Sequence, residues 1–283
     1  MSNVRVGFIG LGSMGGDQAD CLAAGDFALT VYDVYPPSLE RFRDKANIAS
    51  SIADVGKNAD IVGICVRDDK QVKETLLGPE GLLENMAEGS VVLIHSTVNP
   101  ETVAYLIDQA ASRKIEVLDA AVSRTRQQDA KKGEPFVAVM LGGSEESVAR
   151  VMPVLNAYAT NVFHAGPPGS GVKMKIVNNM ISWTHIVTFV QALRLAKASN
   201  VDVNVLLDLL SNNGNLTKNT QALSATLNIP ASDNPAIMEY MESQAGIGEK
   251  DLQLAMDLAK EVGVSVAIAE GVQPLVRNAM TGK

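Results

Sequence analysis

Short apolar runs alternate with amphipathic, helix-like segments over the first 164 residues of the chain. Such an alternation is typical of parallel strands joined by helices that cover both faces of a sheet. We therefore predict a doubly wound α/β domain for residues 1–164. The strands are expected at residues 4–9, 29–32, 61–66, 91–94, 116–118, 136–141 and 161–164, and the helices at 16–24, from about 38, 72–77, 100–111 and 144–157.

The pattern changes at residues 165–171, where three glycines and two prolines occur. The following stretch to about Ser199 has no proline or glycine and carries apolar residues over more than one face, which is typical of a buried helix. Residues 165–199 are thus expected to form a long interdomain helix, and residues 200–283 an all-helical C-terminal domain. Its helices are expected at 203–210, 221–227, 236–242, 250–262 and 267–279.

Glycines punctuate the junction between the first strand and the first helix, in the sequence GLGSMG. Gly10 would permit a tight turn, Gly12 would let the backbone approach a pyrophosphate, and Gly15 would let the helix pack close to its strand. The helix N-terminus would then present free N–H groups to the phosphates. The motif predicts a Rossmann-type dinucleotide site formed by Gly10, Leu11, Gly12, Ser13, Met14 and Gly15.

The second strand is followed by Asp33, 18 residues after Gly15. An acidic side chain at this place of a β-α-β unit binds the ribose hydroxyls of NAD. It would also repel the 2′-phosphate of NADP, and position 34 holds no arginine to neutralise that phosphate. The sequence therefore predicts NAD as the cofactor. The alternative is an ordinary strand-turn-helix with an incidental acid.

Charge and cysteine content narrow the class of protein. Lys and Arg number 24 against 32 Asp and Glu, a formal charge of -8, so nucleic acid and anionic membranes are not expected partners. Cys21 and Cys65 lack metal-ligand spacing and are expected to be small buried residues, and no metal site is predicted. Because the first strand begins by Val4 and no apolar run reaches about 18 residues, we expect a cytoplasmic protein.

Polar residues follow several predicted strands at their carboxyl ends, where open α/β sheets bind ligands. Ser96 and Thr97 are expected either to contact the nicotinamide end of a dinucleotide or to cap the helix that begins near Pro100. His95 has two possible roles, proton carrier or hydrogen-bonded structural residue, and the second is the more common one at a strand end.

Two residues on the predicted long helix, Lys175 and Asn179, are spaced i, i+4 and therefore share one face. Lys173 points about 200° away from Lys175 on a helix of 3.6 residues per turn. A lysine on a buried helix is unusual unless it has a partner or a task. Burial lowers the pKa of an amine, which suits proton exchange with a substrate hydroxyl. The alternative is a lysine that extends to solvent.

Four motifs together resemble the β-hydroxyacid dehydrogenase family, which includes 3-hydroxyisobutyrate and tartronate semialdehyde enzymes, over almost the full chain. They are GFIGLGSMG at 7–15, DAAVSRT at 119–125, GSGVKMKIVNN at 169–179 and KDLQLA at 250–255. The resemblance implies that Lys175 is the catalytic acid/base and that Asn179 helps to hold the substrate. It implies that Ser123 and the following backbone amides bind the substrate's acid group.

The same resemblance implies that Thr97 and Lys250 approach the cofactor near the reacting centre. The strand end at Val66 and Arg67 corresponds to a cofactor loop that the family usually writes Leu-Pro, and its proline is missing here. These four residues are therefore the remaining candidates for cofactor contacts.

The chain departs from the family after Ser123, where the usual Gly-Gly is replaced by Arg124 and Thr125. Two glycines leave space and bare N–H groups for a small carboxylate, whereas an arginine adds a bidentate anion-binding fork. The sulfolactaldehyde reductase branch resembles this chain in having Arg-Thr. Arg124 is accordingly expected either to bind a substrate anion, a sulfonate included, or to turn outward to a neighbouring subunit or solvent.

The sequence thus predicts an NAD-dependent oxidoreductase that interconverts a small anionic 3-hydroxy acid and its aldehyde, semialdehyde or ketone. Lys175 would exchange the hydroxyl proton, and Ser123, Arg124, Thr125 and Asn179 would hold the substrate. The alternatives are a sulfolactaldehyde reductase-like enzyme, an imine reductase-like enzyme, or a catalytically silent dinucleotide-binding scaffold. The long apolar helix suggests a partner subunit, and the family resemblance implies a homodimer or homotetramer.

Overall fold

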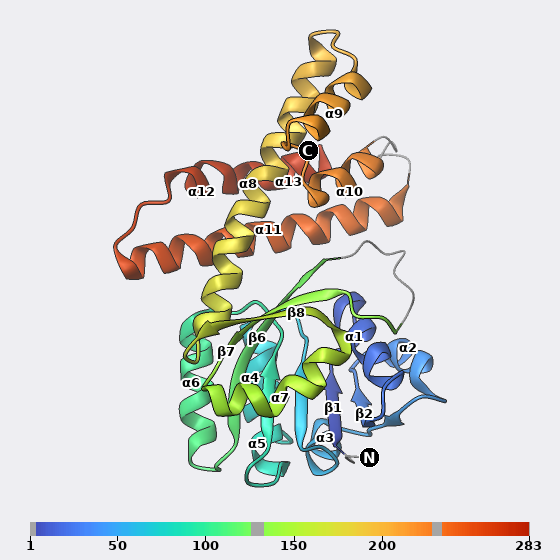
Figure 1. Cartoon of the computed structure of the whole chain (residues 1–283), viewed down its shortest axis with the longest axis vertical. Coiled ribbons are helices and arrows are strands. Elements are labelled where there is room, and N and C mark those ends of the chain that lie inside the picture. Colours follow the sequence, from blue (N-terminus) through green and yellow to red (C-terminus); the bar gives the residue numbers. More distant parts are fainter. Residues whose placement is uncertain (1–3, 126–132, 228–233, 283) are drawn as a thin grey trace. The chain divides into compact units, whose positions relative to one another are not determined.

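The computed structural model describes residues 4–125, 133–227 and 234–282. The chain forms two compact units, residues 1–175 and 176–283. The first unit contains a sheet with helices on both faces, and the second contains only helices (Figure 1). An α/β sheet followed by a helical unit confirms the predicted fold class.

The sheet has the strand order β3-β2-β1-β4-β5-β6-β7-β8 within the described residues. All pairs are parallel except β6 with β7, so the predicted parallel sheet contains one antiparallel pair that the sequence did not indicate. The strands are β1 (Arg5–Ile9), β2 (Ala28–Tyr32), β3 (Asn47–Ile48), β4 (Ile61–Ile64), β5 (Val91–Ile94), β6 (Glu116–Arg124), β7 (Val137–Gly142) and β8 (Ala159–Gly166).

The strand order reverses at β1, because the chain leaves β1 for β2 on one side and returns through β3 to β4 on the other. A crevice opens at such a reversal, outside the carboxyl ends of the strands, and it is where doubly wound sheets bind ligands. The turn after β1 is therefore positioned for a ligand by topology as well as by its glycines.

Helices α1 and α7 contact each other, and α3, α4, α5 and α6 contact one another in a second group. One apolar cluster fills the space between the sheet and α1 and α7, with fully buried Val6, Leu22, Val31 and Tyr158 among its members. The helical segments of this unit are α1 (Ser13–Ala23), α2 (Pro36–Leu39), η1 (Glu40–Phe42), α3 (Ile52–Lys57), α4 (Asp69–Leu77), α5 (Leu82–Asn85), α6 (Pro100–Ala111) and α7 (Glu145–Tyr158).

The helix α8 (Ser170–Ala198) starts in the first unit and continues into the second. Its Trp183 packs in an apolar cluster with Met241, Leu252 and Val276. The other helices are α9 (Val203–Asn212), α10 (Lys218–Leu227), α11 (Pro235–Val262), α12 (Ala267–Val272), η3 (Gln273–Leu275) and α13 (Val276–Thr281). None of the described helices is long and apolar enough to cross a membrane.

Several expected boundaries differ from the structure. The helix α1 begins at Ser13, not at residue 16, and β6 extends to Arg124, not to residue 118. The two helices expected at 236–242 and 250–262 form the single helix α11, which continues through Gly248. A Cβ at Gly248 would lie 2.8 Å from the Trp183 indole, so the glycine serves close packing and does not end the helix. The short elements β3, α3 and α5 were not predicted.

Candidate functional site

The turn after β1 has the geometry that its glycines predict. Gly10 has φ +90°, a left-handed conformation that favours glycine, and its N–H donates to Tyr32 O at 3.0 Å. A Cβ on Gly15 would lie 2.0 Å from Gly10 O, whereas one on Gly12 would meet nothing within 4 Å. Gly15 therefore allows the helix to approach the strand, and Gly12 leaves open space at the helix start for a ligand's phosphates.

Asp33 follows β2 and is fixed beside the glycine turn. Its Oδ2 accepts a hydrogen bond from Leu11 N–H at 2.6 Å, and its Oδ1 accepts one from Tyr35 N–H at 2.7 Å. The carboxylate is half-buried and lies next to the glycine turn in space, although 22 residues separate Asp33 and Leu11. This position fits an acid that receives the ribose hydroxyls of a dinucleotide.

The strand ends of β4 and β5 are joined by Ser96. Its hydroxyl accepts from Val66 N–H at 2.9 Å and donates to Val66 O at 2.8 Å. The N-cap of α6 is Asn99, whose Oδ1 accepts from Glu101 N–H, so Ser96 and Thr97 do not cap that helix. Thr97 is half-buried.

The two candidate cofactor residues after β4 differ in exposure. Val66 is half-buried at the carboxyl edge of the sheet, and Arg67 is exposed. The Arg67 N–H donates to Gln71 Oε1 at 3.0 Å, a bond that fixes the backbone at the start of α4.

His95 is a buried structural residue. Its Nδ1–H donates to Ala120 O at 2.7 Å, and its Nε2 accepts from the Tyr158 hydroxyl at 3.1 Å. The ring stacks on Phe8 with centroids 5.8 Å apart. Burial lowers the pKa of His95 to about 4, so the ring is neutral at pH 7, and both ring nitrogens are engaged. The proton-carrier alternative thus loses its support.

The two cysteines are not suited to nucleophilic chemistry. Cys21 is buried and Cys65 half-buried, and neither forms a disulfide. Burial raises the pKa of the Cys21 thiol to about 11 and that of Cys65 to about 12. Within the described residues no cluster of three or more His, Cys, Asp or Glu side chains could hold a metal ion.

Ser123, Arg124 and Thr125 lie at the end of β6. Ser123 pairs with Ala138 on β7, and the Thr125 N–H donates to Phe136 O at 2.9 Å. In an antiparallel ladder, hydrogen-bonded and non-hydrogen-bonded pairs alternate along the strand. Since Thr125 is in a hydrogen-bonded pair, its neighbour Arg124 is in a non-hydrogen-bonded pair, and the Arg124 N–H points away from β7. The Thr125 hydroxyl donates to Phe136 O at 3.0 Å. The strand β6 therefore continues one residue beyond Ser123, and the N–H of Thr125 is already used by Phe136 O.

The Arg124 side chain contacts α1, the helix that follows the glycine turn. Its Nη2 donates to Asp17 Oδ2 at 2.9 Å, and its guanidinium lies 4.7 Å from the centre of the Phe136 ring. Asp17 also accepts from Arg41 at 3.2 Å, and Arg41 pairs with the buried Asp20. Arg124 is thus part of a charged network around α1, a contact that the spacing of the sequence did not predict.

Near the start of α8, Lys175 is 8% exposed while Lys173 is exposed. The two lysines are therefore not equivalent, as the helical spacing predicts. Lys175 stands on the second turn of the helix, one turn before Asn179, which is also 8% exposed. A buried amine and a buried amide share one face of this helix.

Asn179 belongs to a polar cluster in the second unit whose centre, Asp251, was not singled out from the sequence. Asp251 is 2% exposed, and its Oδ2 accepts from Asn179 Nδ2 at 2.7 Å and from Trp183 Nε1 at 3.3 Å. Lys250 Nζ lies 3.0 Å from its Oδ1. The Asp251 carboxylate thus contacts two of the predicted site residues, Asn179 and Lys250. In the sequence, its only signal was its position next to Lys250 in the KD dipeptide.

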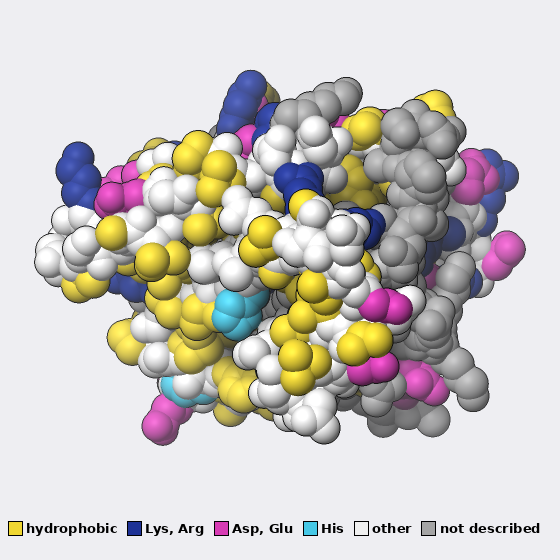
Figure 2. Space-filling model, turned by 90° about the horizontal axis from the view of Figure 1, so that it is seen from above, with side chains coloured by type: hydrophobic (Ala, Val, Ile, Leu, Met, Phe, Trp, Pro, Cys, Tyr) yellow, Lys and Arg dark blue, Asp and Glu magenta, His cyan; other side chains and the backbone are white. Residues whose placement is uncertain are grey.

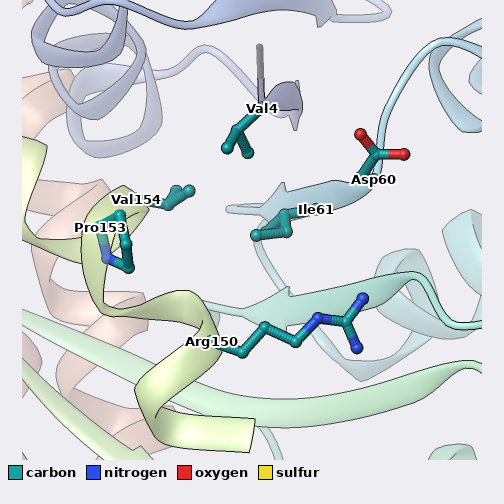
Figure 3. A pocket seen from close by; sticks show the side chains of 6 residues that line it. All are labelled: Val4, Asp60, Ile61, Arg150, Pro153 and Val154. Carbon is teal, nitrogen blue, oxygen red and sulfur yellow. The ribbon is translucent and has the colours of Figure 1, made fainter. Parts of the chain in front are cut away.

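A cavity of about 320 Å³ lies away from these residues (Figure 3). Its lining includes Val4 and Ile61, which stand at the amino ends of β1 and β4. Its charged residues have partners within the first unit, Asp60 with Arg5 and Arg150 with Glu116. The cavity lies at the amino ends of the strands, whereas the glycine turn lies at their carboxyl ends. The remaining lining residues are Pro153 and Val154.

Comparison with known proteins agrees with this geometry. A family model described as the NAD binding domain of 6-phosphogluconate dehydrogenase matches residues 5–166, and one described as NAD-binding of NADP-dependent 3-hydroxyisobutyrate dehydrogenase matches residues 169–283. Two models that adjoin in this order define a dinucleotide-binding oxidoreductase. The chain belongs to the β-hydroxyacid dehydrogenase family.

Individual relatives span nearly the whole chain. It is 30% identical to the mitochondrial 3-hydroxyisobutyrate dehydrogenase of Rattus norvegicus over 98% of this chain and 82% of that protein. It is 28% identical to the 3-sulfolactaldehyde reductase of Escherichia coli over 93% and 86%. The crystal structure of 3-hydroxyisobutyrate dehydrogenase from Salmonella typhimurium superimposes with a TM-score of 0.80 at 25% identity, covering 97% and 93%. The chain is therefore an NAD-dependent oxidoreductase of this family.

Proposed function

We propose that this enzyme interconverts a small anionic 3-hydroxy acid and its aldehyde, semialdehyde or ketone, with Lys175 as the general acid/base. The observation that supports it most is a lysine only 8% exposed, one helical turn before a buried asparagine. A buried amine exchanges protons near neutral pH more readily than an exposed one. Lys175 would move the proton of the substrate hydroxyl, and Asn179 would orient that hydroxyl.

NAD would be held by the glycine turn from Gly10 to Gly15, with Asp33 at the ribose. Bound there, NAD would supply the hydride acceptor for oxidation of the substrate carbon. We assign further cofactor contacts to Val66 and Arg67 after β4, to Thr97 after β5 and to Lys250 on α11.

The acid group of the substrate would bind at the end of β6. The Ser123 hydroxyl and the Arg124 N–H, which points away from β7, are donors suited to a carboxylate. The side chains of Arg124 and Thr125 complete the proposed site. Arg124 would have to exchange Asp17 for the substrate anion, because the two side chains are paired.

A sulfonate is the second candidate for the anionic group. It is favoured by the guanidinium that follows Ser123, because an arginine binds a three-oxygen anion with two parallel hydrogen bonds. The similarity to the sulfolactaldehyde reductase of Escherichia coli supports the same class of substrate.

The test is a panel of 3-hydroxy carboxylates and hydroxy sulfonates followed by NADH absorbance. Lys175→Ala should lower kcat by a factor of about 100 or more while the Kd for NADH stays within about twofold. The matched control is Lys173→Ala, because Lys173 is exposed on the same helix. Full turnover in Lys175→Ala would overturn the assignment. Turnover of no panel member by the wild type would favour the silent-scaffold alternative.

We also propose that the enzyme is a homodimer or homotetramer. No residue of α9 is buried, although its sequence is strongly apolar, and Val205 and Leu209 on one face are 63% and 56% exposed. Figure 2 shows hydrophobic side chains scattered among polar ones on the face of the molecule that it draws. Exposed apolar faces of this kind are typical of subunit interfaces. Light scattering after size exclusion would test the proposal, and a monomer would contradict it.

A further inference from the structure

We propose that Asp119 is the positioning residue of this active site: it anchors the start of α8 to β6 and so sets where Lys175 stands relative to Ser123. The inference rests on the proposed role of Lys175. In this role Asp119 acts through the helix that it holds and not by contact with substrate or cofactor.

The contacts are those of a helix cap supplied from another element. Asp119 is 1% exposed, and its Oδ1 accepts from Gly169 N–H at 2.7 Å while its Oδ2 accepts from Val172 N–H at 2.8 Å. Gly169 precedes the first residue of α8, and Val172 is its third. In ordinary capping boxes, local side chains satisfy the N–H groups at these two positions. Here one carboxylate from β6 binds both.

The surrounding backbone is built to admit this carboxylate. A Cβ on Gly142, which pairs with Asp119 across β6 and β7, would lie 2.4 Å from Asp119 Oδ1. A Cβ on Gly171 would lie 2.4 Å from Met140 O and 2.8 Å from Asp119 O. Gly169 has φ +88°, which favours glycine. These three glycines let the first turn of α8 rest directly on the strands.

The anchor connects the two elements that carry the proposed chemistry, the start of α8 and the strand β6. Lys175 follows Val172 by three residues, about 4.5 Å along the helix axis, and Ser123 follows Asp119 by four residues on one strand. A movement of the helix start would therefore displace the amine relative to the strand that binds the acid group. Misplacement of a catalytic group by about 1 Å costs as much as a hundredfold in rate.

The experiment compares Asp119→Asn with wild type in turnover, NADH binding and amide hydrogen exchange. The amide side chain keeps the size of the carboxylate but turns a donor towards one of the two N–H groups. We expect faster exchange at residues 169–175, a kcat at least about tenfold lower and a Kd for NADH within about twofold. Asp119→Glu keeps the charge but displaces the helix, so it should also lower kcat, and it replaces Asp119→Asn if that variant does not fold.

Two further measurements separate positioning from general damage. In a Lys175→Ala background, Asp119→Asn should cause little additional loss, because both changes remove the same interaction. The matched control is Ser144→Ala, which removes the cap of α7, a helix with no proposed site residue. It should lower the Tm and leave kcat unchanged.

Unchanged exchange at residues 169–175, wild-type kcat in Asp119→Asn and Asp119→Glu, or losses that multiply in the double variant would each overturn the positioning role. Full activity of Lys175→Ala would instead overturn the proposed function. In that case the exchange data would still decide whether Asp119 anchors the helix.

Discussion

Arg124 at the end of β6 donates a 2.9 Å hydrogen bond to Asp17 on α1. The strand that carries Ser123 is thereby joined to the helix that follows the dinucleotide turn. Both side chains are partly exposed, at 26% and 36%, so the ion pair contributes at most about 1 kcal/mol to stability. A pair of that strength is weak enough for a substrate anion to displace.

Replacing Asp17 should therefore report on what Arg124 binds. If Arg124 holds the substrate anion, Asp17→Asn should lower the KM several-fold by freeing the guanidinium, and Arg124→Ala should raise it about tenfold. Steady-state kinetics with a carboxylate and a sulfonate would measure both effects. Arg43→Ala is a suitable control, since Arg43 forms an exposed pair with Glu40. Unchanged KM in both Asp17 and Arg124 variants would make the pair a purely structural link.

Asp33 should determine the preference for NAD over NADP. Asp33→Asn keeps an acceptor for Leu11 or Tyr35 N–H but removes the charge that repels a 2′-phosphate. The ratio of kcat/KM for NAD to that for NADP should fall about tenfold, equivalent to about 1.4 kcal/mol. The exposed Asp26 offers a control of the same charge change. An unaltered ratio in Asp33→Asn would show that selectivity arises elsewhere.

Asp251 should support both stability and turnover. Asp251→Ala leaves the donors of Asn179 and Trp183 without their acceptor and Lys250 without this ion pair, so unfolding should become easier by about 2 kcal/mol. Because the orientation of Asn179 is lost, kcat should fall as well. Denaturant unfolding and steady-state kinetics would measure the two effects. Asp257→Ala, an exposed residue on the same helix, should change neither, and equal behaviour of the two variants would refute the assignment.

His95 should make the fold sensitive to mild acid. Burial lowers the pKa of His95 from 6.5 to about 4, so the folded protein keeps a neutral ring while the unfolded chain takes up a proton. Its contribution to stability is therefore complete above pH 6.5 and declines as the pH falls towards 4, by about 3 kcal/mol in total. Unfolding free energies of wild type and His95→Gln at several pH values should diverge over this range. His185→Gln, at an exposed position, is the control, and parallel curves for His95→Gln would exclude the effect.

Local sequence was sufficient for the elements whose signals lie within a few residues. The apolar runs located β1, β4 and β5, and the spacing of Gly10, Gly12 and Gly15 predicted a turn whose backbone has the expected geometry. Helical periodicity separated Lys175 from Lys173 for the same reason, since neighbours on a helix face are fixed by the sequence number alone.

Contacts between distant segments were beyond such patterns. Antiparallel pairing with β7 extends β6 to Arg124, and no residue in 119–124 indicates that pairing by itself. Gly248 resembles a helix breaker until the Trp183 indole is placed against it. Asp119 lacked a local signal, because its donors Gly169 and Val172 lie 50 or more positions away. For Asp251 the adjacent Lys250 was visible in the sequence, but its donors Asn179 and Trp183 were not.

The sequence by itself therefore determined the family, the order of the longer strands and helices, the cofactor and the lysine proposed for proton transfer. It did so because glycine turns, strand-end acids and helical spacing act over short stretches of chain. The tertiary structure decided what surrounds those residues: Asp17 against Arg124, Asp251 against Asn179, and Asp119 against the start of α8. A buried carboxylate must find donors to be stable, and only the folded chain brings those donors to it.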